Sequence, residues 1–205
     1  MIAIIDYGAG NLQSVEKALR HIGCSCTVTG KPQELMSAQA AVLPGVGAFG
    51  EAMASLRSRG LDSAIKSYVK TGRPFLGICL GLQVLFESSE ESPGIEGLSL
   101  LPGKILRLPE DCGLKVPHIG WNSLDLKIPG WLLKGLPREP YVYFVHSYYL
   151  QAEPELVCAT AQYGAEIHAA VQSGSLAACQ FHPEKSGSTG LSILRNFADY
   201  VKQNT

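Results

Sequence analysis

Clusters of lysine and arginine are absent from this sequence of 205 residues, whose formal net charge is −1 at pH 7. Without such a cluster, the sequence gives no sign of a nucleic-acid-binding surface. Long apolar runs are also absent, which argues against a membrane-spanning helix. The apolar run at residues 1–5 meets Asp6 too soon for a secretion signal. We therefore expect a cytoplasmic protein, or one in an organelle after removal of a transit peptide, that binds neither nucleic acid nor membrane.

The six cysteines lack the spacing of a metal site. Cys24 and Cys26 are too close together for the usual zinc pattern, and no second close pair exists. The chain is also unlike a short secreted scaffold stapled by disulfides. We expect no metal and no other cofactor.

The sequence also lacks linkers, repeats and low-complexity tracts, and 46% of its residues are hydrophobic. We therefore predict one globular domain over residues 1–205.

The first half of the chain alternates short β-type runs with helical segments, which is typical of a parallel sheet covered on both faces. Predicted strands lie at residues 2–5, 26–29, 40–43 (ended by Pro44 and Gly45) and 75–78, and predicted helices at 12–22, 51–57 and 61–70. In the second half, strands are predicted at 105–108, 122–126, 141–150, 156–162, 167–172 and 177–181, and a helix at 189–202. We therefore predict a single α/β domain with a mixed, largely parallel sheet flanked by helices.

Cys79 has the most informative surroundings of any residue in the chain. It lies in the centre of Gly-Ile-Cys-Leu-Gly at residues 77–81, after an apolar β-type run and before helix-forming residues. This is the nucleophile-elbow pattern with cysteine in place of serine. Glycines let the strand turn sharply into a helix, whose N-terminus favours a thiolate over a thiol. The pattern predicts nucleophilic chemistry on an acyl group.

His182 has the best setting for a catalytic base among the five histidines. It follows the predicted strand at residues 177–181, and catalytic side chains gather at strand ends in open α/β sheets. Glu184 comes two residues later, and its carboxylate could hold the second ring nitrogen of His182. Alone, this His-Pro-Glu run is more typical of a surface turn with a solvated glutamate. Beside the elbow, each motif supplies what the other lacks, so we predict a triad of Cys79, His182 and Glu184.

A glycine-rich run at residues 44–50 has two interpretations. It matches the dinucleotide-binding fingerprint, because Gly45, Gly47 and Gly50 lie between a predicted strand and a predicted helix. However, that fingerprint belongs to the first βα turn, and the window for its acidic residue falls in the helical stretch at residues 61–70. The N–H groups of such a loop can instead bind an oxyanion, and we prefer that use.

Six motifs carry a resemblance to a known family. They are Asp-Tyr-Gly-Ala-Gly-Asn at 6–11, Leu-Pro-Gly-Val-Gly-Ala-Phe at 43–49, Gly-Ile-Cys-Leu-Gly-Leu-Gln at 77–83, Pro-His-Ile-Gly-Trp-Asn at 117–122, Tyr-Phe-Val-His-Ser-Tyr at 143–148 and Phe-His-Pro-Glu-Lys-Ser-Gly at 181–187. Together they resemble the class I glutamine amidotransferases, which use a Cys-His-Glu triad. The resemblance covers essentially the whole chain. It is closest to members that serve as the glutaminase subunit of a two-subunit enzyme of histidine biosynthesis.

This resemblance implies a flavodoxin-like fold and a role for each matching residue. Cys79 attacks the side-chain amide of glutamine, His182 acts as general acid and base, and Glu184 orients His182. The backbone N–H groups of Val46 and Leu80 hold the oxyanion, after the peptide of the loop at residues 44–47 reorients. The positions implied to hold the glutamine head group are Gly47, Gln83, Glu91, Ser147 and Tyr148.

The resemblance also implies a heterodimer. Ammonia would pass to a cyclase subunit with a (β/α)₈-barrel fold, which converts a phosphoribulosyl formimino carboxamide ribonucleotide into imidazole glycerol phosphate and an aminoimidazole carboxamide ribonucleotide. A sealed path makes chemical sense, because bulk water would protonate ammonia and end its nucleophilicity. The residues expected at the subunit interface are Asn11, Pro117, Trp121, Tyr143 and His146.

Two other functions remain open on the sequence. A free-standing hydrolase of the α/β-hydrolase type would have the order nucleophile, acid, histidine. It would need an acid between Cys79 and His182, for which Asp111 and Asp125 are available. Alternatively, a scaffold or regulatory subunit with an inactive triad would bind a partner without releasing ammonia.

Overall fold

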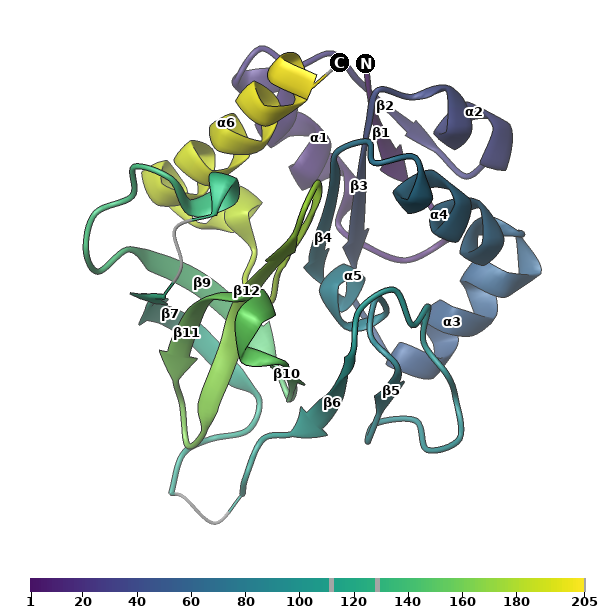
Figure 1. Cartoon of the computed structure of the whole chain (residues 1–205). Helices are drawn as coiled ribbons and strands as arrows, with labels where there is room; N and C mark the ends of the chain where they lie inside the picture. The colour runs from purple at the N-terminus through teal and green to yellow at the C-terminus, as the bar shows by residue number, and fades with distance from the viewer. Residues whose placement is uncertain (111–112, 128–129, 205) are drawn as a thin grey trace.

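The computed structural model describes residues 1–110, 113–127 and 130–204. These residues form a central sheet of eight strands, of which the first five in spatial order are parallel and the last three antiparallel to their neighbours (Figure 1). In spatial order the strands are Cys26–Thr29 (β2), Ile2–Ile5 (β1), Ala40–Gly45 (β3), Phe75–Cys79 (β4), Leu176–Cys179 (β13), Glu166–Ser173 (β12), Val157–Gln162 (β11) and Asp125–Leu126 (β8).

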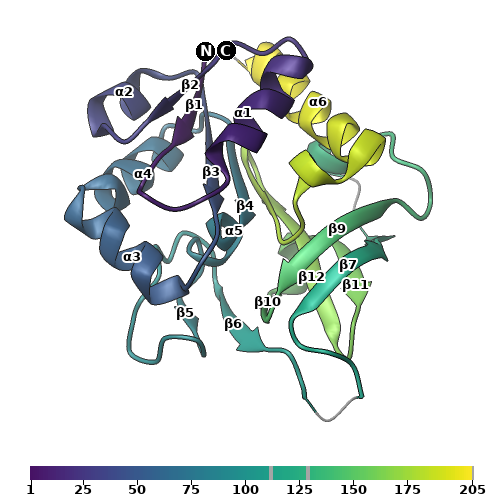
Figure 2. The same cartoon turned by 180° about the vertical axis from the view of Figure 1, so that it is seen from behind.

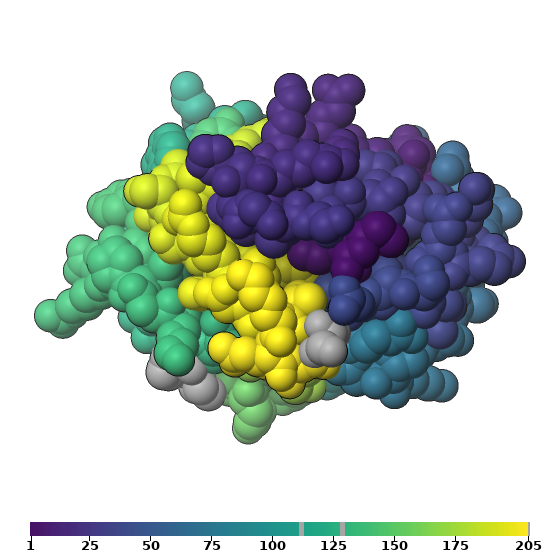
Figure 3. All heavy atoms as spheres, turned by 90° about the horizontal axis from the view of Figure 1, so that it is seen from above, coloured from purple at the N-terminus to yellow at the C-terminus, as the bar shows by residue number. Residues whose placement is uncertain are grey.

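Helices cover both faces of this sheet (Figures 1 and 2). They are Leu12–His21 (α1), Pro32–Ser37 (α2), Phe49–Ser58 (α3), Leu61–Lys70 (α4) and Gly187–Asn204 (α6). On β1, Ile2 and Ile4 belong to the core formed with α1 and α6. Ala3 and Ile5 belong to the core formed with α2, α3 and α4, because successive side chains of a strand point to opposite faces. Helix α6 also lies beside the N-terminal segment of the chain (Figure 3).

Two smaller sheets and several short helical turns complete the described part of the chain. The three-stranded sheet contains, in order, Tyr148–Ala152 (β10), Gly103–Arg107 (β6) and Ser88–Ser89 (β5), and the two-stranded sheet pairs His118–Ser123 (β7) with Tyr141–His146 (β9). The turns are Leu80–Gln83 (α5) and the 3₁₀ turns Trp131–Leu133, Pro154–Leu156 and Pro183–Lys185. None of the helices in the described ranges is both long and apolar enough to span a membrane.

The predicted α/β fold with a mixed, largely parallel sheet is confirmed. The end of β3, however, was predicted wrongly at residues 44 and 45. The strand continues through Pro44, and Gly45 lies opposite Cys79 on β4. β1 pairs with β3 only as far as Val42, so beyond that residue β3 is paired on one side. A proline without an N–H group is tolerated at such a position.

The prediction of one strand at residues 141–150 is also wrong, because the chain changes sheets at Ser147. β9 pairs with β7, whereas β10 pairs with β6. The strand predicted at residues 122–126 is likewise divided at Leu124 between β7 and β8. Both runs have β-type side chains throughout, so the pattern of side chains cannot reveal a change of pairing partner.

Gly81 provides a test of how closely the elbow packs on β3. A Cβ atom at Gly81 would lie 1.8 Å from the carbonyl oxygen of Leu43, which is backbone inside the sheet. We therefore expect Gly81→Ala to lower the free energy of unfolding by about 3 kcal/mol or more, measured by urea denaturation.

Gly72→Ala is the matched control. Gly72 has a left-handed φ of +73°, and nothing lies within 4 Å of its Cβ position. Only backbone strain is added there, so a loss of about 1–2 kcal/mol is expected. Equal losses in the two variants would contradict the close packing at Gly81.

Candidate active site

The carboxyl ends of β3, β4 and β13 lie side by side at one edge of the central sheet. In the parallel register, Gly45 of β3 lies opposite Cys79 of β4, and β13 pairs with β4 up to Cys179. The segments that follow these strands therefore leave the sheet at the same edge. One carries Val46, the next is the turn at Cys79, and the third carries His182.

Cys79 occupies the sharp turn between β4 and α5. Its φ of +55° and ψ of −110° are rare for a residue with a side chain. The glycines around it make the turn possible, since a Cβ at Gly77 would lie 2.7 Å from the carbonyl oxygen of Gly81. Helix α5 has only four residues, so its dipole is weaker than the sequence pattern suggested. Stabilisation of a thiolate at Cys79 therefore depends mainly on neighbouring side chains.

His182 and Glu184 form a buried pair directly after β13. The distance between His182 Nδ1 and Glu184 Oε1 is 2.8 Å, and the side chains are 2% and 1% exposed. Burial alone would lower the pKa of His182, but the Cys79 thiolate and the Glu184 carboxylate outweigh it and raise this pKa to about 9. At neutral pH the imidazole is therefore protonated. Because Glu184 holds Nδ1, the exchangeable proton is on Nε2, which has no hydrogen-bond partner among the described residues.

A cavity of about 370 Å³ lies beside Cys79 and His182. The residues predicted to hold glutamine all line it: Gly47, Gln83, Glu91, Ser147 and Tyr148. Val46 and Leu80, which were predicted to supply oxyanion-binding N–H groups, line it as well. Lys185 also reaches the cavity wall and was not predicted. Its sequence signal was its place in the motif at residues 181–187, directly after His-Pro-Glu.

Gln180 is a second residue that the sequence pattern missed. Its side chain is fully buried, and its Nε2 donates to the Sγ of Cys79 at 3.7 Å. Its Oε1 accepts a hydrogen bond from Gln83 Nε2 at 3.0 Å. The available signal was a single amide side chain in the apolar run Ala-Ala-Cys-Gln-Phe at residues 177–181.

Two of the N–H groups that a dinucleotide fingerprint would offer to a pyrophosphate are already occupied. Phe49 N donates to Glu91 Oε2 at 2.7 Å, and Gly50 N donates to Ser92 Oγ at 3.0 Å. A Cβ at Gly50 would also lie 2.9 Å from that hydroxyl, so this glycine serves close packing. Val46 and Gly47 line the cavity instead, which favours the oxyanion interpretation of the loop.

The exposed side of the β7–β9 pair carries a set of apolar side chains, Ile119, Trp121, Tyr141 and Tyr143, which we call the aromatic face. Ile119 is 60% exposed, and Trp121 and Tyr141 are each 55% exposed. Trp121 packs edge-on against Tyr143, with 6.2 Å between ring centroids. The Lys185 ammonium lies 5.9 Å from the centre of the Tyr143 ring. Lys185 therefore connects the aromatic face to the cavity.

The other residues predicted at an interface differ in exposure. Pro117 is exposed and Asn11 is half-buried. His146 is only 6% exposed and lines the cavity. Its Nδ1 bonds the Tyr148 carbonyl oxygen at 2.9 Å, and its Nε2 lies 3.0 Å from His118 Nδ1. His146 thus belongs to the cavity wall, and its strand position alone could not reveal this.

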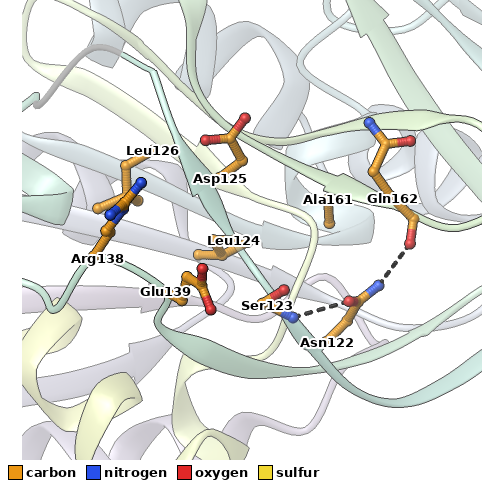
Figure 4. A pocket seen from close by; sticks show the side chains of 9 residues that line it. All are labelled: Asn122, Ser123, Leu124, Asp125, Leu126, Arg138, Glu139, Ala161 and Gln162. Atoms are coloured by element: carbon orange, nitrogen blue, oxygen red, sulfur yellow. Dashed lines mark hydrogen bonds between the residues drawn. The ribbon is translucent and has the colours of Figure 1, made fainter.

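A second hollow, of about 490 Å³, lies at the far edge of the central sheet and contains Asp125 (Figure 4). Asp125 is on β8, separated from β13 by β12 and β11, and it pairs with Lys127 at 2.6 Å. Asp125 is therefore not near His182, whose Nδ1 is already held by Glu184. Asp111, the other candidate, lies outside the described residues.

This arrangement of elbow, buried histidine and adjoining glutamate agrees with the family comparison. The model of the family "Glutamine amidotransferase class-I" matches residues 3–200, and the chain belongs to this family. Its sequence is 53% identical to imidazole glycerol phosphate synthase subunit HisH of Methanothermobacter thermautotrophicus, over 98% of this chain and 100% of that protein. It is 51% identical to the subunit of the same name from Moorella thermoacetica, over 98% and 95%. The solved structure of PurLQS from Thermotoga maritima has the same fold, with a TM-score of 0.77 at 18% identity over 97% of each chain.

The raised pKa of His182 can be measured directly. We expect the imidazole to titrate at about 9 in the wild-type chain, compared with 6.5 for an unperturbed histidine. In Cys79→Ala and in Glu184→Gln the pKa should fall, because each variant removes one negative partner while burial remains. Proton NMR of the imidazole ring would follow the titration. A wild-type value at or below 6.5 would contradict the charged pair.

Proposed function

We propose that the chain hydrolyses glutamine to glutamate and ammonia at Cys79 and supplies the ammonia to a cyclase subunit. The observation that carries this proposal is the position of Cys79 beside the buried His182–Glu184 pair, at the ends of neighbouring parallel strands and in the wall of a cavity. The names of the relatives support the biosynthetic context.

The first half of the reaction forms a thioester. The Cys79 thiolate attacks the side-chain carbonyl carbon of glutamine, and the carbonyl electrons move onto oxygen. Backbone N–H groups of Val46 and Leu80 stabilise this oxyanion. The tetrahedral intermediate collapses as the C–N bond breaks, and His182 Nε2 gives its proton to the departing nitrogen. A histidine that begins protonated is suited to this step.

The second half of the reaction releases glutamate. Neutral His182 removes a proton from water, which attacks the thioester carbonyl carbon. The C–S bond then breaks, its electron pair stays on the sulfur, and the thiolate is restored beside a protonated His182. Glu184 keeps Nδ1 protonated throughout, so Nε2 performs both proton transfers.

The residues that line the cavity beside Cys79 bind the glutamine substrate. Both N–H donors of the Gln83 amide are used inside the protein, on Tyr148 O and Gln180 Oε1, so only its oxygen remains to accept a hydrogen bond from substrate. Glu91 offers a carboxylate that suits the substrate ammonium group. Gly47 and the turn at Ser147 bring further backbone groups to the cavity.

The proposed partner is a (β/α)₈-barrel cyclase that binds the aromatic face. Large exposed aromatic side chains such as Trp121 are typical anchors of protein interfaces. Pro117 and Asn11 extend the proposed contact. We place the complex in the cytoplasm. The product ammonia would reach the barrel without meeting bulk water.

The triad assignment predicts a defined pattern of activities in the complex with the cyclase. Cys79→Ala should abolish glutamine-dependent synthesis but leave synthesis from added ammonium salts, because only the ammonia supply is lost. Glu184→Gln should lower kcat for glutamine by about 10³-fold or more, since His182 loses its orienting carboxylate. Ammonia release and cyclisation would be assayed separately.

Asp125→Asn is the control for these variants. It should leave kcat within about twofold, because surface changes away from a site have small effects. Loss of turnover in Asp125→Asn with full activity in Glu184→Gln would favour the hydrolase alternative. Failure of wild-type Cys79 to form an adduct with a glutamine analogue would favour the inactive-scaffold alternative.

The interface assignment predicts that Trp121→Ala raises the Kd for the cyclase by about 30-fold, which corresponds to about 2 kcal/mol for an aromatic anchor. Trp131→Ala is the matched control, since Trp131 stacks on Tyr200 of α6 with 4.2 Å between ring centroids. Isothermal titration calorimetry would compare the two. Equal affinity of Trp121→Ala and wild type would exclude the aromatic face as the main contact.

A further inference from the structure

The orientation of two buried amides next to Cys79 is fixed by hydrogen-bond chemistry. The carbonyl oxygen of Tyr148 can only accept, so the nitrogen of Gln83, 3.0 Å away, must face it. The same nitrogen lies 3.0 Å from the side chain of Gln180 and must meet an oxygen there. The nitrogen of Gln180 is therefore the end that faces Cys79 Sγ, at 3.7 Å.

We propose that Gln180 is a catalytic residue that stabilises the Cys79 thiolate through an N–H···S hydrogen bond, and that Gln83 is the positioning residue that holds the Gln180 amide in this orientation. The assignment deepens, and rests on, the proposed glutaminase function. An amide pointing the other way would present its oxygen to the sulfur and repel a thiolate. The carbonyl oxygen of Tyr148 thus determines, through two side chains, which group the nucleophile meets.

Burial makes this contact consequential. Gln180 is fully buried, and Gln83 and Cys79 are 5% and 7% exposed, so water competes little for the donor. Hydrogen bonds to a charged group in such surroundings are stronger than those between neutral groups. A donor on the sulfur assists twice: it favours the thiolate before attack, and it stabilises the same thiolate when the C–S bond of the thioester breaks.

Other titratable groups also act on the sulfur, and the test must separate them. Cys79 interacts electrostatically with His182, Tyr7 and Cys179. Glu184 acts through His182, and three further groups line the same cavity, namely Glu91, His146 and Lys185. None of these side chains is altered by a change at Gln180, so a shift caused by that change reports on the amide.

The test is the pH dependence of iodoacetamide alkylation at Cys79 in the full chain without glutamine. Peptide mass spectrometry separates Cys79 from the other cysteines, and Cys79→Ala gives the blank. Gln180→Met keeps the side-chain length but cannot donate. We expect the pH midpoint of alkylation in this variant to rise by about one unit. Below the midpoint, Cys79 should be alkylated about tenfold more slowly than in the wild-type chain.

Two more variants and a control sharpen the test. Gln180→Glu should shift the midpoint further upward, because an ionised carboxylate repels a thiolate. Gln83→Met should give a smaller shift in the same direction, because Gln180 remains but is no longer oriented. Gln172→Met makes the same chemical change on β12, away from the cavity, and should leave the midpoint unchanged.

Unchanged midpoints in folded Gln180→Met and Gln180→Glu would overturn the proposal, even if both variants melted at lower temperature. A purely structural role for Gln180 predicts that combination. Failure of the wild-type chain, with its cyclase, to release ammonia from glutamine would instead overturn the proposed function. The alkylation midpoints would still be readable in that case, so the two failures are distinguishable.

Discussion

The site depends on how closely the elbow packs against the end of β3. Side chains at Gly45 and Gly81 would collide with neighbouring atoms, with Tyr7 Oη at 2.3 Å in one case and Leu43 O at 1.8 Å in the other. Only bare backbone fits between these segments. This contact fixes Cys79 in a conformation that costs about 1–3 kcal/mol and that an isolated turn would not keep. The parallel sheet therefore holds the nucleophile in place by packing. His182 lies at the same edge because it follows β13, which is parallel to β4.

Most buried polar groups around the nucleophile have a defined partner, but His182 Nε2, Glu184 Oε2 and Tyr7 Oη do not have one among the described residues. Glu184 Oε1 accepts a hydrogen bond from His182 Nδ1, Gln83 Nε2 donates to Gln180 Oε1, and Gln180 Nε2 donates to the sulfur of Cys79. A charged pair removed from water is stable only when such hydrogen bonds replace the lost solvent. One of these atoms is informative, because His182 Nε2 is the atom proposed to transfer the proton. A permanent partner on this atom would compete with both of the proposed proton transfers.

Local patterns in the sequence were sufficient for the elbow, the His-Pro-Glu motif and most strands of the sheet. Each of these depends on residues close together in the chain, such as the glycines that flank Cys79. What could not be predicted depends on contacts distant in sequence. Gln180 meets Cys79 from 101 residues away, and the break at Ser147 reflects a change of strand partner rather than of composition. The alternation of side chains shows which face of a strand is buried, but it does not show which distant segment packs against that face or pairs with that strand.

The two halves of the site differ in how firmly they are held. Cys79 and His182 lie within the core, at 7% and 2% exposure, and their positions follow from strand pairing. The loop proposed to bind the oxyanion does not share this support: Val46 is 41% exposed, and nothing lies within 4 Å of a Cβ placed on Gly47, which has a φ of +99°. Segments with few packed contacts change conformation at the lowest free-energy cost. A conformational change at the site would therefore begin most easily in this loop, because Cys79 ends a strand, β4, that is paired on both sides.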